Sequence, residues 1–198
     1  TTAPVTEGVT EPMRIWHLLT HTSGLTYGFH NNHVTDALYR AAGFEWGIPK
    51  GMDLEKACDT WAGLPLAFQP GTEWLYGVST DVVGRIVEVV SGQDLDAFIR
   101  ARISAPLGLA DTGFWAPAEA ANRVARAQVD PVTNKRQEFP DALEKPRMFS
   151  GGGGMVSLWF ARETLGVLVG VPNWQRLLRV IEQQAAVLLA HVPGAVGL

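Results

Sequence analysis

The stretch FQPGTEWLYGVSTDVVGRIVEVVSG, residues 68 to 92, holds the strongest structural signals of the chain. Pro70 and Gly71 predict a tight turn, because proline fixes φ and glycine tolerates positive φ. A short extended segment then leads to a sharp corner at Gly77, directly after Tyr76. We therefore expect the phenol of Tyr76 to sit on a rigid corner, which is how binding and catalytic groups are usually mounted.

An amphipathic helix is expected directly after this corner. Ser79 or Thr80 is predicted to cap its start, and Asp81 to add negative charge to its first turn. Gly92 suits a left-handed helix end. The apolar positions recur at helical spacing, and they are Val82, Val83, Ile86, Val87 and Val90.

This stretch resembles the tyrosine-motif segment of the serine β-lactamase-like family, which includes class C β-lactamases, DD-peptidases and family VIII carboxylesterases. Two other stretches agree with that family in the same order: HLLTHTSGL at residues 17–25 and FSGGGGMVS at residues 149–157. Three ordered matches are a far stronger signal than one short motif. The resemblance divides the chain into a partial β-lactamase-related domain, residues 1–157, and an unmatched segment, residues 158–198, with an amphipathic C-terminal helix.

The resemblance also implies functional roles for particular residues. In this family a Ser and a Lys one helical turn apart form the nucleophile pair, and a Tyr assists proton transfer. By resemblance Tyr76 is that catalytic residue, the alternative being a tyrosine packed under the turn. Val78, Ser150, Gly151 and Gly152 are the implied substrate-binding residues. Val78 replaces the Asn of the family's Tyr-x-Asn motif, and valine makes no such hydrogen bonds, which favours the carboxylesterase branch.

The Ser-x-x-Lys pair is absent, because none of the six serines has a Lys three residues later. A C-terminal Lys-Thr-Gly-type strand is also absent. The resemblance therefore implies an internal fragment of a serine hydrolase, whose parent is a carboxylesterase acting through an acyl-enzyme. The main alternative is a catalytically inactive fragment or homologue that serves as a binding module.

A third hypothesis, a metal-binding helical protein, rests on four histidines. His17 and His21 lie at i, i+4 on one predicted helix, with His30 and His33 close by in sequence. The Glu of the zinc protease motif is missing between them, so we predict no metal site, and no cofactor. The sequence around Ser79 fails the Gly-x-Ser-x-Gly nucleophile elbow at its last position, so Ser79 is interpreted as a helix cap.

The glycine run at residues 151–154 allows two interpretations. It could form an anion-binding nest before a helix, since backbone N–H groups would point outward there. A Walker-type Lys is missing, so close packing of the run against a cleft floor is favoured. A helix is predicted to start near Met155.

Composition bounds the remaining choices. The chain has 198 residues, 46% apolar and 18% charged, enough for one domain or one and part of another. A net charge of −4 without a basic block argues against nucleic acid, and no apolar run is long enough to span a membrane. The single Cys58 excludes an internal disulfide. We expect a small-molecule ester or β-lactam-like substrate for the intact parent and self-association of the fragment. The compartment stays open between cytoplasm and periplasm.

The rest of the chain also favours helices. The fold class expected is mostly α: the helical portion of the two-domain β-lactamase/transpeptidase-like α+β fold, with a small β-hairpin and most of the sheet missing. The hairpin is predicted between residues 124 and 139. Further helices are predicted after Pro12, over 34–42, after Asp53, from Asp94 to Pro106, and over 174–189.

Overall fold

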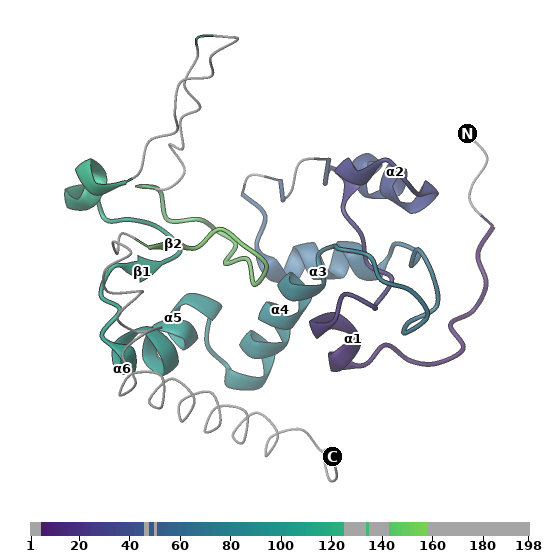
Figure 1. Ribbon diagram of the computed structural model, residues 1–198, viewed down its shortest axis with the longest axis horizontal. Helices are drawn as coiled ribbons and strands as arrows, with labels where there is room; N and C mark the ends of the chain where they lie inside the picture. Colours follow the sequence, from purple (N-terminus) through teal and green to yellow (C-terminus); the bar gives the residue numbers. More distant parts are fainter. Residues whose placement is uncertain (1–4, 46–47, 50, 125–133, 135–142, 158–198) are drawn as a thin grey trace. The chain divides into compact units, whose positions relative to one another are not determined.

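The computed structural model describes residues 5–45, 48–49, 51–124, 134 and 143–157, drawn in colour in Figure 1. The described chain is mostly helical, as predicted, with one two-stranded sheet. It divides into two compact units. The first joins the chain up to Val89 to Arg147–Gly153, and the second holds Val90–Pro146 and the chain from Gly154. The predicted boundary after residue 157 stays a prediction.

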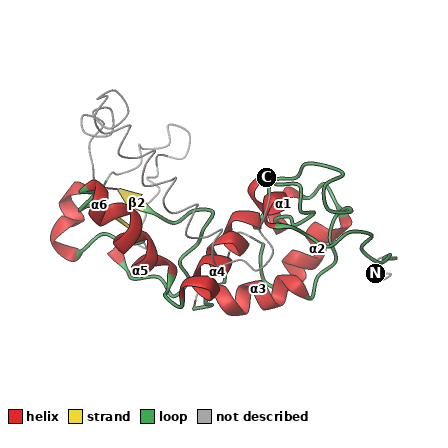
Figure 2. Cartoon of the chain, turned by 90° about the horizontal axis from the view of Figure 1, so that it is seen from below, coloured by secondary structure: helices red, strands yellow, loops and turns green. Residues whose placement is uncertain are grey.

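The described part of the first unit contains four α-helices and a 3₁₀ turn, and one of these helices starts at a predicted capping residue. Asp53 accepts a hydrogen bond from the backbone N–H of Lys56, and this cap starts α3 as predicted. An ion pair between Glu55 of α3 and Arg85 of α4 joins two helices that lie side by side in Figures 1 and 2. The elements are α1 Ile15–Leu19, η1 Gly28–His30, α2 Val34–Ala41, α3 Leu54–Ala62 and α4 Ser79–Ser91, whose last residues cross into the second unit.

The core of the first unit collects apolar side chains from every one of these helices or their flanks. Trp61 and Tyr39 are 1% exposed, and the ring of Trp61 lies 5.4 Å from that of Phe44. Met148, far along the chain, packs into the same cluster and so brings the glycine run to this unit. The buried cluster comprises Leu18, Leu25, Tyr39, Phe44, Leu54, Ala57, Trp61, Val78 and Met148.

The second unit begins with the helix predicted after Asp94. The Asp94 carboxylate accepts from the N–H of Ala97 and starts α5, Leu95–Ile99. The expected helix end at Pro106 is wrong, because a π-helical turn, Arg100–Ser104, leads into α6, Ala105–Leu107. Pro106 lies in the first turn of α6, where a missing N–H costs little. Gly108, at φ +70°, ends this helix.

The sheet consists of β1, Thr112–Gly113, and β2, Val156–Ser157, paired antiparallel. Thr112 lies opposite Ser157 and Gly113 opposite Val156. The helix expected near Met155 is therefore wrong. Its neighbours form a strand because a distant partner segment supplies the hydrogen bonds, and no local pattern reports that partner. Almost all of the predicted hairpin, and the whole predicted C-terminal helix, lie outside the described residues.

Candidate active site

Tyr76 sits on a backbone corner that is held from two sides. A Cβ atom on Gly77 would lie 2.4 Å from the carbonyl oxygen of Leu25 and 2.7 Å from Cα of Thr26, so the corner packs directly on that backbone. On the other side, the Tyr76 carbonyl lies 2.8 Å from Nε2 of His30. A carbonyl only accepts, so His30 carries a hydrogen on Nε2. The side chain of Tyr76 stays 44% exposed.

Two aromatic side chains flank the Tyr76 ring. Its centroid lies 4.8 Å from that of His21 and 5.5 Å from that of Tyr27. His21 adopts φ +56°, a left-handed conformation that is uncommon outside glycine. The carbonyl of His21 accepts a hydrogen bond from the N–H of Leu75. The residue at which the chain turns after α1 therefore also binds the segment that carries Tyr76. The Tyr76 ring thus lies against two side chains of one stretch, residues 21–27, which is far from it in the sequence.

Asp81 ties the glycine run to the first turn of α4. Its carboxylate is 2% exposed and accepts from the hydroxyl of Ser150 and, at 3.2 Å, from the N–H of Gly152. Burial raises the pKa of Asp81, and the hydrogen bonds from Ser150 and Gly152 only partly oppose that effect. Cβ atoms on Gly151 and Gly152 would lie 2.1 Å and 2.6 Å from oxygens of Thr80. The contacts match the close backbone packing expected for the run.

A cavity of about 290 Å³ lies beside this arrangement, within the first unit. It brings together four of the predicted site residues: Tyr76, Val78, Ser150 and Gly152. Gly151 does not line it. Val78 is 2% exposed and belongs to the core cluster, so it lines the cavity while its side chain is packed in the core. The remaining lining residues are Tyr27, Phe29, Tyr39, Phe44, Ile48, Asp81 and Gly153.

Ser79 differs from its predicted role. Helix α4 begins at Ser79 itself, and the Val78 carbonyl accepts from the N–H groups of Asp81 and Val82, so Val78 holds the capping position. The Ser79 hydroxyl lies 2.8 Å from that of Ser23, and both side chains are fully buried. The hydrogen bond between Ser23 and Ser79 joins the start of α4 to the segment after α1.

The four histidines considered as metal ligands have separate structural surroundings. His17 Nδ1 accepts from the N–H of Arg14, and His33 caps α2 through Thr35. His21 and His30 contact Tyr76 in different ways. Within the described ranges, no three His, Cys, Asp or Glu side chains gather as a metal site would require.

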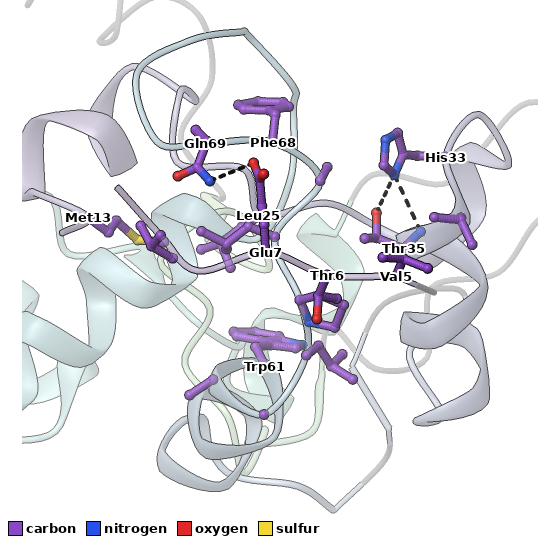
Figure 3. Close-up of a pocket in the computed structure, with 18 of the residues that line it drawn as sticks. Val5, Thr6, Glu7, Met13, Leu25, His33, Thr35, Trp61, Phe68 and Gln69 are labelled. Atoms are coloured by element: carbon purple, nitrogen blue, oxygen red, sulfur yellow. Dashed lines mark hydrogen bonds between the residues drawn. The ribbon is translucent and has the colours of Figure 1, made fainter. Parts of the chain in front are cut away.

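A larger cavity, of about 940 Å³, lies elsewhere in the first unit (Figure 3). The chain from Val5 to Glu7 borders it on one side and Trp61 on another, and Gln69 donates to Glu7 across 2.9 Å. It holds none of the predicted site residues. None of the helices described here is both long and apolar enough to cross a bilayer.

Sequence reasoning missed the environment of Tyr76. Tyr27, His30 and Asp81 were not predicted to lie near the phenol or its cavity. His21 belongs to the matched stretch HLLTHTSGL, and Tyr27 follows that stretch by two residues. Their closeness in sequence to a recognised motif is the one available signal, and it does not show that they meet Tyr76.

Comparison with known proteins gives a family and several relatives. The family described as Beta-lactamase matches residues 2–176. Esterase EstB of Burkholderia gladioli is 41% identical over 106 residues, which cover 52% of this chain and 26% of the esterase. Lovastatin esterase of Penicillium rubens is 32% identical over 156 residues, which cover 79% of this chain and 36% of that protein.

Among solved structures, EstCE1, described as a hydrolase with promiscuous acyltransferase activity, aligns with a TM-score of 0.62 at 29% identity. The alignment covers 76% of this chain and 44% of EstCE1. The chain thus spans less than half the length of each of these relatives.

Proposed function

Because the chain belongs to the β-lactamase family of serine hydrolases, we propose that it is the tyrosine-bearing helical part of a carboxylesterase. Membership confirms the resemblance drawn from the three motifs, and the match runs past Ser157 to residue 176. The alignment with EstCE1 confirms the fold class as the helical portion of the larger fold. The observation that carries the proposal is the position of Tyr76, a partly exposed phenol on a braced corner beside an apolar cavity.

The chemistry proposed for the whole enzyme is acyl transfer through serine. The serine oxygen bonds to the ester carbonyl carbon, the C–O bond to the alcohol breaks, and an acyl-enzyme remains until water hydrolyses it. The serine proton must leave during attack and a proton must reach the departing alcohol. Tyr76 is proposed to assist both transfers as a general acid–base group. The nucleophilic Ser and its Lys are not among these 198 residues.

Esters are proposed over lactams because of the cavity's chemistry. By resemblance Val78 stands where the family's motif has the amide-binding Asn. Aromatic or aliphatic side chains such as Phe29 and Phe44 supply much of the cavity wall. An apolar wall accommodates an acyl chain but offers little to the amide of a lactam side chain. A small ester with an apolar acyl group is the proposed substrate class.

The decisive experiment substitutes Tyr76 in a full-length enzyme that contains this segment. Tyr76→Phe should lower kcat for p-nitrophenyl butyrate by about two to four orders of magnitude, the scale for losing a general acid–base group. KM should change much less. If kcat stays within a few-fold of the parent, Tyr76 is structural.

A second candidate function, a non-catalytic binding module, is favoured by the missing Ser-x-x-Lys pair. The 198-residue chain alone should show no saturable hydrolysis of p-nitrophenyl acetate or butyrate, since a lone tyrosine forms no acyl-enzyme. A full-length protein that is equally inactive would favour the binding module. Turnover by the short chain that survives Tyr76→Phe would show that the chemistry lies elsewhere.

A further inference from the structure

The 3₁₀ turn η1 and the residue before it contact Tyr76 at two separate points. His30, the last residue of η1, binds the Tyr76 carbonyl through Nε2 at 2.8 Å. Tyr27, which precedes η1, faces the Tyr76 side chain, with ring centroids 5.5 Å apart and planes inclined by 53°. One short segment therefore contacts both the main chain and the side chain of the proposed catalytic residue.

This segment is itself firmly placed. A Cβ on Gly28 would lie 2.4 Å from the carbonyl oxygen of Phe44, so the turn packs on the backbone beyond α2. The Gly28 carbonyl also accepts from the guanidinium of Arg40. Phe29 stacks on the ring of Tyr27 at 4.9 Å and 17°. The conformation of this segment is thus fixed by contacts that do not involve Tyr76. A segment that positions a catalytic side chain needs to be rigid in this way.

The Tyr27 phenol is suited to donate a hydrogen bond. Burial raises the pKa of Tyr27 most, and the negative charge of Asp81 and a side-chain hydrogen bond with Tyr76 raise it further. A phenol whose pKa is raised keeps its proton throughout the working range of an esterase. It therefore remains a donor whatever the protonation state of its neighbour.

We propose that Tyr27 and His30 are positioning residues for Tyr76, with the Tyr27 hydroxyl donating to the Tyr76 phenol oxygen and His30 holding the Tyr76 carbonyl. The inference rests on the proposed role of Tyr76 and adds the residues that aim its oxygen at the reacting groups. Neither residue touches the substrate's reacting atoms in this scheme. Both act by keeping the phenol in the orientation that proton transfer needs.

Kinetics of the full-length enzyme test this role. Tyr27→Phe keeps the ring contacts and removes the hydroxyl, and it should lower kcat about tenfold with KM within twofold, the effect of one hydrogen bond made to a reacting group. His30→Ala should lower kcat similarly. His30→Gln should recover most of the loss, because the glutamine amide also donates to a carbonyl. Unchanged kcat in Tyr27→Phe, or equal losses in both His30 variants, would overturn the proposal.

Tyr76→Phe, measured beside them, separates the two hypotheses. If Tyr76→Phe retains activity, the proposed function fails. If it is inactive while Tyr27→Phe equals the parent, the positioning role alone fails.

A spectroscopic test on the 198-residue chain does not depend on catalysis. The chain has three tyrosines, so labelling their ζ-carbons with ¹³C gives three assignable signals. Tyr27→Phe should displace the Tyr76 signal, whereas Thr60→Val, which removes a hydroxyl from α3 outside the cavity lining, should leave it in place. A Tyr76 signal that responds equally to both variants, or to neither, would refute the contact between the two phenols.

Discussion

At the scale of single residues, Asp81 links the stability of the site to pH. Because burial raises its pKa, the folded chain binds the Asp81 proton more tightly than the unfolded chain does. The free energy of unfolding therefore falls as pH rises from the unfolded value of about 3.9 through the raised pKa. Its stabilising contribution is complete only below that unfolded value.

Asp81→Asn should remove this dependence, since the amide keeps an acceptor oxygen for Ser150 and Gly152 but has no charge to bury. The Tm of the variant relative to the parent should increase as the pH is raised from 4 to 8. Circular dichroism melts at several pH values measure it, with Asp59→Asn, on the exposed side of α3, as the matched control. A variant whose relative Tm falls with rising pH would contradict the assignment.

Val78 lines the cavity and also belongs to the buried core cluster, and its sequence position alone did not reveal the packing. Val78→Asn should move the ratio of kcat/KM from esters toward lactams in the full-length enzyme. It should also cost about 1–3 kcal/mol of stability, because a buried amide lacks partners there. Val83→Asn, on α4 but outside the cavity lining, should destabilise without the change in selectivity. A parent that already prefers cephalosporins to esters would refute the esterase proposal.

At the scale of elements, the crossing of Gly77 over residues 25 and 26 is a steric requirement. Gly77→Ala should destabilise the chain by about 1–3 kcal/mol, the usual cost of overpacking, because the added methyl meets backbone atoms that cannot rotate away. Gly8→Ala is the matched control, since its Cβ would meet nothing within 4 Å. Urea unfolding of both variants measures the difference. Equal urea midpoints for Gly77→Ala and Gly8→Ala would show that the chain accommodates a methyl at residue 77 with no loss of stability.

The elements that sequence predicted well are those whose signals are local. Asp53 and Asp94 cap the helices that follow them, and Gly92 takes the left-handed conformation expected of a helix end. Of the predictions that were wrong, the Ser79 cap and the helix near Met155 depended on distant partners, whereas the helix end at Pro106 depended on the local π-helical turn. The strand after Met155 exists because β1 pairs with it.

The same division applies within the candidate site. The three motifs identified Tyr76 and the glycine run, and the structure places both at one cavity. The contacts of Tyr76 with His21 and Tyr27 join residues that are far apart along the chain. Such contacts arise from the packing of whole segments, so periodicity and capping signals carry no trace of them.

At the scale of the whole molecule, the segment beyond Ser157 provides a prediction based on sequence alone. An apolar stripe on its predicted amphipathic helix would cover exposed apolar surface elsewhere on the chain, since uncovered patches of that kind drive association. Deleting residues 158–198 should lower the Tm and increase light scattering. Each buried Leu contributes about 1.5–3 kcal/mol, and several together exceed the reserve of a marginal domain. The stripe comprises Leu177, Leu178, Ile181, Leu188 and Leu189.

Substituting Gln183 and Gln184, which lie between the stripe positions, provides the control for this deletion and should leave both measurements unchanged. A shortened chain that stays monomeric with the same Tm would show that the segment is dispensable.

Transplanting this tyrosine into another helical scaffold would require two separate pieces of chain. The corner at Gly77 packs on the backbone of Leu25 and Thr26, and the neighbouring Tyr76 carbonyl accepts a hydrogen bond from His30. A graft of the tyrosine loop alone would leave the orientation of the phenol unfixed. A graft that also carries residues 21–30 would bring the contacts that fix it. Enzyme engineers should therefore exchange these two pieces as a matched pair when recombining relatives of this family.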